Sequence, residues 1–213
     1  MYKRTYSSVY CYYYSEGGHS MNEQLTIPAK ENFTFPSLTR HQLAKTIVTH
    51  LPTHRPIVFV CIGTDRSTGD ALGPLVGHQL TQSSLSHFLV YGTIEHPVHA
   101  KNLEKTMEEI AHTHVSPYIV AIDACLGLRK HIGHVTFQTG PLTPGAAFDR
   151  SLPPVGHSHI TGIVNSKGMM DFFVLQSTRL HHVLSMATFI ASSIRLASFL
   201  YQKEKTNNRS LPF

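Results

Sequence analysis

The chain has 213 residues, of which 41% are hydrophobic and 15% charged, and its formal net charge is +5 with the 16 histidines neutral. This composition excludes a disordered chain, and three cysteines without a CxxC pair exclude a secreted disulfide scaffold and a zinc ribbon. Three of the five excess positive charges lie in residues 1–20 and 203–213, so the body carries no charge pattern typical of nucleic-acid binding.

The first predicted helix begins near Ser37, because serine is a common helix cap, and it ends before Pro52 and Pro56. Its apolar residues recur at helical spacing: Leu43, Ala44, Ile47, Val48 and Leu51. Residues 57–63 (IVFVCIG) follow as a short, continuous apolar run, the pattern of a strand buried on both faces of a parallel sheet.

The next segments alternate between helical and strand patterns along the chain. We predict helices over 70–82 and 100–114, strands over 88–93, 118–124, 134–140, 159–164 and 172–176, and a long helix from Thr178 to Gln202. Strands that alternate with helices in this order imply right-handed crossovers and parallel pairing. The expected fold is a single three-layer α/β/α domain with a mostly parallel, doubly wound sheet.

We expect this domain to span residues 35–202, after a flexible N-terminal extension (1–34) and before a polar C-terminal tail (203–213). The most apolar stretch, residues 183–200, contains Arg195 and several hydroxyl side chains, which favours a core helix over a membrane span. The start of the chain has no apolar run typical of a secretory signal. The expected location is the cytoplasm, without a membrane or nucleic-acid partner.

Carboxylates stand at two places where ligands bind in open parallel sheets, outside the carboxyl ends of strands. The first strand leads into CIGTDRSTGDALGP (61–74), which contains Asp70, and the third into AIDACLG (121–127), which contains Asp123. Glu95 follows the second strand. We expect these strand ends to form the functional site.

Each carboxylate also has a structural interpretation. Asp70 precedes an apolar helix face and can serve as a helix N-terminal carboxylate, stabilised by free amides and the helix dipole. Asp65 can close its own loop on backbone amides, and Asp123 can cap a neighbouring loop. The loop 63–70 can also bind phosphate, although it lacks the GK[ST] ending of a P-loop. Cys125 is either a buried thiol or a nucleophile.

Three histidines lie in suggestive loops: His99 in EHPVHAKN, and His157 and His159 in PPVGHSHITG. The HxH spacing on an extended chain directs the last two side chains to one face, where they could offer two ligands to a metal. Most of the other histidines are expected on the surface.

Taken together, the motifs GTDRSTGDALGPLVG (63–77) and AIDACLG (121–127) resemble the sporulation proteins called the spore protease YyaC family. That family is similar to the germination proteases of spore-forming bacteria and, more distantly, to the hydrogenase maturation endopeptidases. The resemblance covers roughly residues 35–202, and its specific part is DALGP together with IDA.

The resemblance implies that Asp70 and Asp123 are the catalytic pair of an endopeptidase of sporulation or germination. In the maturation enzymes the corresponding acidic residues and a histidine bind the metal of the precursor substrate. His159 or His157 is the nearest counterpart here, so a divalent metal, if bound, would be held by Asp70, Asp123 and His159. We otherwise expect no cofactor. Thr64, Asp65, Glu95, His99 and His159 are expected to line the site.

A carboxylate pair has a physical rationale of its own. Two carboxylates in a partly dry cleft cannot both ionise cheaply, so one keeps its proton while the other accepts a proton from water. A helix N-terminus lowers the pKa of Asp70, which makes Asp123 the expected proton holder. The expected partner is a protein or peptide substrate, and a homo-oligomer is compatible with the sequence. The alternatives are a metal-dependent maturation-type protease and a non-catalytic regulatory or binding protein that retains the fold.

Overall fold

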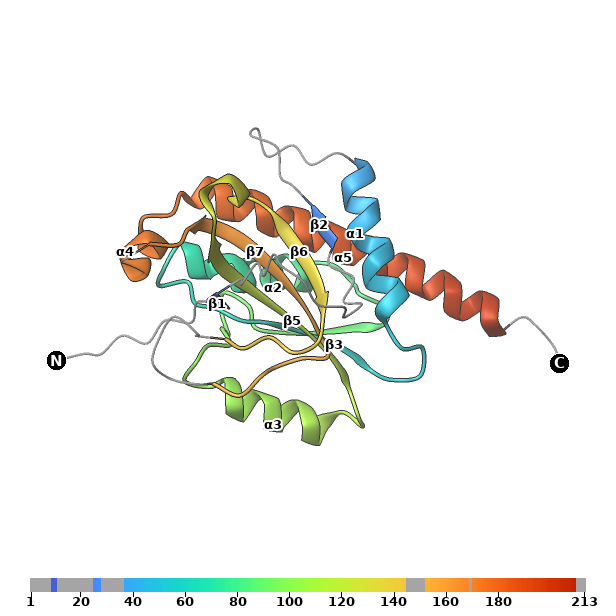
Figure 1. Cartoon of the computed structure of the whole chain (residues 1–213). Helices are drawn as coiled ribbons and strands as arrows, with labels where there is room; N and C mark the ends of the chain where they lie inside the picture. Colours follow the sequence, from blue (N-terminus) through green and yellow to red (C-terminus); the bar gives the residue numbers. More distant parts are fainter. Residues whose placement is uncertain (1–8, 11–24, 28–36, 145–151, 169, 210–213) are drawn as a thin grey trace, which may run out of the picture.

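The computed structural model describes residues 9–10, 25–27, 37–144, 152–168 and 170–209. Within these ranges, seven strands form one sheet in the order β2-β6-β7-β5-β3-β4, and β1 also pairs with β5 (Figure 1). The strands are β1 (Val9–Tyr10), β2 (Leu25–Ile27), β3 (Ile57–Cys61), β4 (Phe88–Tyr91), β5 (Tyr118–Gly127), β6 (Val135–Thr139) and β7 (Ser158–Ser166).

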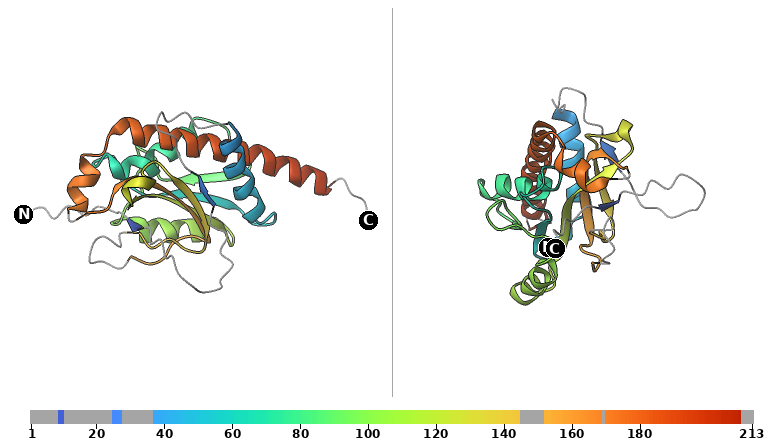
Figure 2. Two further views of the ribbon diagram at one scale, coloured as in Figure 1. Left: turned by 45° about the horizontal axis from the view of Figure 1, so that its top comes forward. Right: turned by 90° about the vertical axis from the view of Figure 1, so that its left-hand side faces the viewer.

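The central strands β4, β3, β5 and β7 run parallel, while β6 is antiparallel to β7 and β2 is antiparallel to β6. The helices are α1 (Ser37–His50), α2 (Leu72–Thr81), α3 (Leu103–Thr113), α4 (Asp171–Gln176) and α5 (Leu180–Arg209), with 3-10 turns η1 (Gly69–Ala71) and η2 (Arg129–His131). Figures 1 and 2 show α1, α2 and α5 on one side of the sheet and α3 on the other. The predicted three-layer, mostly parallel α/β/α architecture is therefore confirmed.

Strand alternation divides the buried residues of the sheet between the two helical layers. Ile57, Phe59 and Cys61 of β3 pack into the core with α1, α2 and α5, whereas Val58 and Val60 pack into the core with α3. Because both faces of β3 are covered, every residue of this strand is buried. This is why the strand reads as an unbroken apolar run in the sequence.

One predicted strand is wrong. Residues 172–176 form the helix α4, and only Leu175 of this helix is fully buried, so the five-residue apolar run does not reflect a strand buried on both faces. Short apolar runs do not distinguish strand from helix by periodicity. The carboxylate of Asp171 accepts a hydrogen bond from the Gly168 N–H at 2.8 Å, which ties the turn before α4 to the first residue of the helix.

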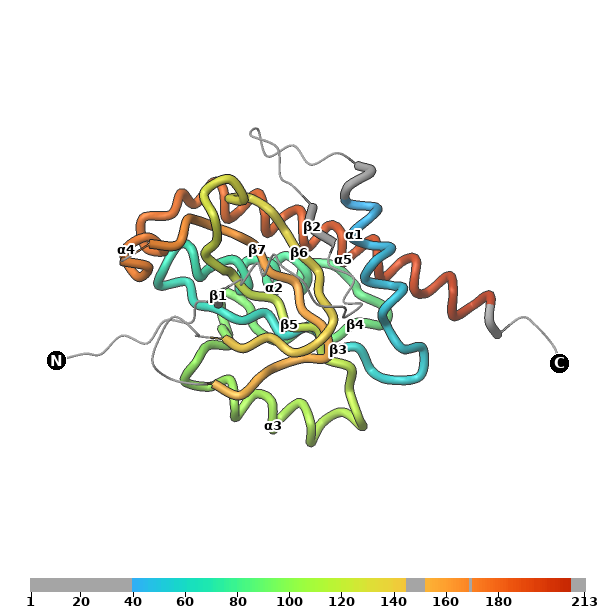
Figure 3. The backbone as a smooth tube through the Cα atoms, viewed as in Figure 1, coloured from blue at the N-terminus to red at the C-terminus, as the bar shows by residue number. Residues whose placement is uncertain are grey.

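The long helix α5 packs against α1 and α2, as Figure 3 lets the reader follow along the backbone. By length and composition, it is the one helix of the described residues that could cross a membrane, and 56% of its most apolar window is buried inside the protein. It ends at Arg209 and not near Gln202, so the helix takes in most of the predicted polar tail. Residues 210–213 lie outside the described residues, as does most of the predicted extension 1–34 apart from β1 and β2.

We predict that Gly73→Ala destabilises the fold by about 3 kcal/mol, since forcing extra atoms into a packed core costs about this much. A Cβ atom at Gly73 would lie 2.0 Å from the carbonyl oxygen of Ile62, so α2 would have to move away from the end of β3. Urea denaturation measures the change. Gly168→Ala is the matched control, because no atom lies within 4 Å of its Cβ position, and it should change stability by less than about 0.5 kcal/mol. Equal stabilities of the two variants would contradict the prediction.

Candidate active site

Asp123 lies inside strand β5 and not at its end, which corrects the sequence-based boundary at residue 124. Its neighbour Ile122 pairs with Cys61, the last residue of β3, so Asp123 is the first position at which β5 extends past β3. The Asp123 side chain is fully buried, and its Oδ1 accepts a hydrogen bond from the Ala124 N–H at 2.7 Å. Because β5 is longer than β3, the Asp123 carboxylate lies beyond the last residue of β3.

A row of buried polar side chains crosses the sheet at the level of Asp123. Thr161 of β7 stands opposite Asp123, and Thr136 of β6 stands opposite Thr161. Their hydroxyl oxygens lie 2.6 Å apart, and both threonines are buried. The residues flanking each of the three pack toward α1, α2 and α5, so by alternation Asp123, Thr161 and Thr136 face the other side of the sheet.

The loop that leaves β3 is bonded tightly across the end of the sheet. The Ile62 N–H donates to the Ile122 carbonyl at 2.7 Å, and the Thr64 N–H donates to the Asp70 carbonyl at 3.1 Å. Gly63 has φ +143°, and a Cβ atom there would lie 2.0 Å from the Asp70 carbonyl oxygen. Only glycine allows the backbone at position 63 to lie this close to the Asp70 carbonyl, and this contact holds the start of the loop against η1.

Asp70 belongs to η1, which packs against β5 and α4, so the structure brings the segment with Asp70 beside the strand with Asp123. Among the described residues, neither carboxylate oxygen of Asp70 has a hydrogen-bond partner, and the side chain is fully buried. Burial raises the pKa of Asp70 to about 8, although the nearby Ser67 side chain partly opposes the shift. The Ser67 hydroxyl lies outside hydrogen-bonding geometry, so we regard burial as decisive.

The expectation that a helix N-terminus lowers the pKa of Asp70 is therefore wrong. The residue that caps α2 is Ala71, and no side chain makes a capping hydrogen bond there. Asp70 precedes this cap in a 3-10 turn, where the cost of removing its charge from water exceeds the benefit of the helix dipole. Asp70 thus keeps its proton at neutral pH.

Two predicted lining residues lie in the same loop. Thr64 is buried, and its hydroxyl accepts a hydrogen bond from the Arg66 N–H at 3.3 Å. Asp65 is exposed, so its side chain stands apart from the buried carboxylates. The loop therefore contributes Thr64 to the buried surroundings of Asp70 and presents Asp65 to solvent.

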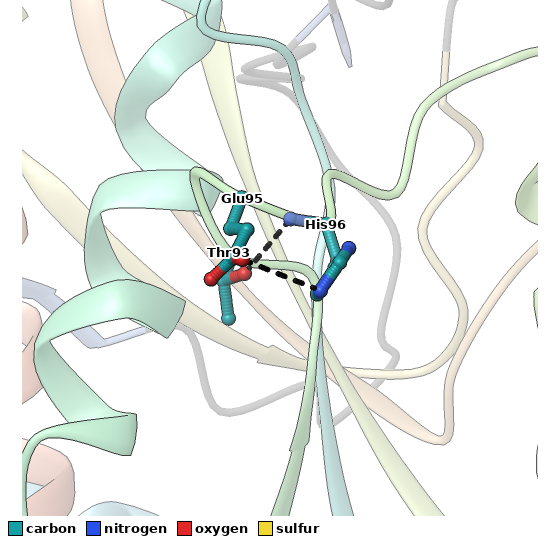
Figure 4. Close-up of polar contacts among 3 residues, drawn as sticks. All are labelled: Thr93, Glu95 and His96. Atoms are coloured by element: carbon teal, nitrogen blue, oxygen red, sulfur yellow. Dashed lines mark hydrogen bonds and ion pairs between the residues drawn. The ribbon is translucent and has the colours of Figure 1, made fainter.

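Glu95 and His99 line a hollow of about 520 Å³ beside β4 and α3, and its lining includes neither Asp70 nor Asp123. The Glu95 side chain is 83% exposed, and its Oε1 lies 3.9 Å from Nε2 of His96 (Figure 4). The backbone N–H of His96 donates a hydrogen bond to the Thr93 hydroxyl. An exposed carboxylate at this distance from a histidine contributes little to stability. His99 directly follows Val98, whose carbonyl accepts a hydrogen bond from the Gly63 N–H at 2.7 Å, so this hollow borders the loop that leads from β3 to Asp70.

His159 lies on β7, two residues before Thr161, and therefore on the same face of the sheet as Asp123. Its Nδ1 bonds the Gly140 carbonyl at 3.0 Å and its Nε2 bonds the Gln138 side chain at 3.1 Å. Burial lowers the pKa of His159. Both ring nitrogens of His159 are thus engaged by Gly140 and Gln138.

His157 lies at the opposite end of β5. Its Nδ1 accepts from the Ile119 N–H at 3.0 Å, and its ring stacks on Tyr118. The described residues contain no group of three His, Cys, Asp or Glu side chains that could hold a metal ion. The donor set suggested by the maturation enzymes (Asp70, Asp123 and a histidine) therefore does not fit, because His159 is turned into its own hydrogen bonds.

Sequence reasoning missed Ser67, Thr136 and Thr161. A signal was present in the strand patterns, because Thr161 follows His159 at a spacing of two and Thr136 precedes Gln138 at the same spacing. Which threonines lie at the level of Asp123 depends on strand order and register, and neither can be read from the sequence. Cys125 and Cys61 are both buried, and burial raises the pKa of the Cys61 thiol.

Comparison with known proteins places the chain in a family. Residues 35–193 match the family model described as protein of unknown function DUF1256. The chain belongs to this family. It is 52% identical over 142 residues to the uncharacterized protein YyaC of Bacillus subtilis (strain 168), covering 67% of this chain and 69% of that protein. The resemblance drawn from the two motifs is thereby confirmed.

A solved structure with some likeness is the [NiFe] hydrogenase maturation protease HycI from Thermococcus kodakarensis KOD1. It shares 19% identity and a TM-score of 0.43, with 67% of this chain and 94% of that chain covered.

We predict that Asp70→Asn changes the pH dependence of stability. Between the ordinary pKa of 3.8 and the native value of about 8, the native state holds a proton that the unfolded chain has released. The wild-type free energy of unfolding therefore falls as pH rises through this window, by at most about 1.4 kcal/mol per pH unit. The free energy of unfolding of the variant does not fall in this way, so the variant should become more stable relative to wild type as pH rises from 4 to about 8.

Urea denaturation of both proteins from pH 4 to pH 9 measures the difference. Asp65→Asn is the matched control, because it removes an exposed carboxylate from the same loop and should follow the wild-type curve. Parallel curves for wild type and Asp70→Asn would mean that Asp70 ionises alike in the native and unfolded states.

Proposed function

We propose that the protein is an endopeptidase of sporulation or germination that hydrolyses a peptide bond in a protein substrate, with Asp70 and Asp123 as its catalytic carboxylates. The observation that carries the proposal is the environment of Asp70. Its carboxyl is fully buried, has no hydrogen-bond partner among the described residues, and has a pKa raised to about 8. A group of this kind costs stability and is typical of functional sites.

Both carboxylates are fully buried, and they differ in their hydrogen bonds. Asp70 keeps its proton at neutral pH, as a general acid requires. The Oδ1 of Asp123 accepts a backbone N–H, an interaction that stabilises an ionised carboxylate. We therefore assign the acid role to Asp70 and the base role to Asp123, which reverses the assignment expected from the helix dipole.

In the proposed reaction, Asp123 takes a proton from a water molecule whose oxygen bonds to the carbonyl carbon of the scissile peptide. Asp70 gives its proton to the carbonyl oxygen, and the tetrahedral intermediate then breaks its C–N bond. Asp123 gives the proton that it took from water to the leaving nitrogen, and a hydroxyl of the intermediate returns its proton to Asp70. The products are a new carboxyl end and a new amino end, and both side chains recover their starting states. The proposed route needs no cofactor and runs entirely through side chains of this chain.

The resemblance of the DALGP and IDA motifs to the germination proteases supports a protein substrate and a setting in the sporulating cell or spore. We place the protein in the cytoplasm of that cell. The engaged ring nitrogens of His159 favour this reaction over a metal-dependent maturation-type protease. A homo-oligomeric state stays a prediction.

The proposal is tested by adding purified protein to extract from sporulating cells and reading new amino termini by mass spectrometry. We predict discrete cleavage products with wild-type protein and at least a hundredfold loss of these products with Asp70→Asn or Asp123→Asn. Asp65→Asn is the control at an exposed carboxylate and should cleave as wild type does. A parallel incubation with EDTA tests the metal-dependent alternative.

Identical fragment patterns with wild type and with Asp123→Asn would overturn the proposal and favour a binding protein. Loss of cleavage in EDTA, restored by a divalent metal, would instead favour the maturation-type reaction. Thermal unfolding of each variant shows whether a loss of cleavage reflects loss of the fold.

A further inference from the structure

Apolar and basic side chains are exposed on the segments that follow β5 and β7. Leu128, Met170 and Phe173 are 55%, 63% and 60% exposed, which is unusual for large apolar side chains. Three exposed cations accompany them. We name the η2–α4 surface after its six members: Leu128, Arg129, Lys130, Lys167, Met170 and Phe173.

The two segments that form this surface begin side by side. Gly127 and Ser166 are partners in the β5–β7 pairing, and the Lys167 N–H donates to the Gly127 carbonyl at 2.9 Å. Leu128 and η2 continue from one strand, and the turn into α4 continues from the other. Figure 1 shows α4 at the end of the sheet where β7 finishes.

The charge of this surface is mostly positive. Residues 128–134 and 167–173 contain a single acidic residue, Asp171, whose carboxylate is bonded to the Gly168 N–H. The acidic residues of α3, including Glu104 and Glu108, lie on the opposite face of the sheet from α1, α2 and α5. The surface is therefore complementary to an acidic partner and repels a second copy of itself.

The inner side of α4 connects this surface to the candidate active site. Leu175 is buried, and a Cβ atom at Gly69 would lie 2.7 Å from its side chain and 3.0 Å from its carbonyl oxygen. Gly69 directly precedes Asp70 in η1. A chain segment that contacts the exposed Phe173 thus lies on the same helix as Leu175, which packs against the turn that carries Asp70.

We propose that the η2–α4 surface is the docking site for the substrate, a protein segment in which apolar side chains alternate with acidic ones. This inference rests on the proposed function and names its substrate class. The apolar residues of the segment cover Leu128, Met170 and Phe173, and its carboxylates pair with Arg129, Lys130 and Lys167.

The test selects a displayed library of random dodecapeptides on the full-length protein. We expect enrichment of peptides that combine Leu, Ile or Phe with Asp or Glu. The most enriched peptide is then synthesised, and its Kd is measured by fluorescence anisotropy. Arg129→Glu/Lys130→Glu should raise the Kd at least tenfold, and Phe173→Ser should weaken binding by a similar factor. Lys101→Glu/Lys105→Glu makes the same charge change at exposed lysines elsewhere and should leave the Kd unchanged.

Absence of enriched peptides, enrichment without acidic residues, or an equal effect of the two charge-reversal variants would overturn the proposal. Sedimentation completes the test: a wild-type dimer that Phe173→Ser dissociates would assign the surface to self-association instead. Peptide binding without any cleavage that depends on Asp70 would refute the proposed function while leaving the docking surface intact. Cleavage of the protein substrate at the wild-type rate by Arg129→Glu/Lys130→Glu would refute the docking proposal alone.

Discussion

The burial of the Asp70 carboxyl is the constraint on which the candidate site depends. A carboxylate removed from water without a partner is costly, so the group keeps its proton and its pKa rises to about 8. The described part of the chain supplies no hydrogen-bond donor within bonding geometry of either oxygen. The protein thus holds a protonated acid at neutral pH, at a cost in stability that a purely structural residue would avoid by substitution to an apolar side chain.

The surrounding packing places this acid beside β5. Gly63 lets the loop turn back so that the Asp70 carbonyl meets the Thr64 N–H, and Gly69 lets α4 pack directly on η1. On the other side, β5 extends past β3 and brings Asp123 level with Thr161. Two glycines and one long strand therefore bring together two segments, η1 and β5, that are far apart in the chain.

Local patterns were sufficient to predict the main layers of the fold. The apolar run 57–63, the helical spacing of Leu43 to Leu51 and the alternation of elements predicted β3, α1 and the parallel sheet. They failed where an apolar run was short, as at α4, and where the environment of a side chain was decisive. The ionisation of Asp70 depends on what covers it, and the hydrogen bonds of His159 depend on Gly140 and Gln138 reaching it. Both are tertiary contacts that no local pattern encodes.

The central claim is that Asp70 is protonated in the native protein at neutral pH, and a carbon-13 NMR titration of the aspartate side-chain carboxyls tests it most directly. The resonance that disappears in Asp70→Asn identifies the group. We predict that the chemical shift of this resonance changes with a midpoint near pH 8 in the folded protein. A midpoint near the ordinary value of 3.8 would contradict it, because Asp70 would then be a carboxylate at neutral pH and could not act as the general acid.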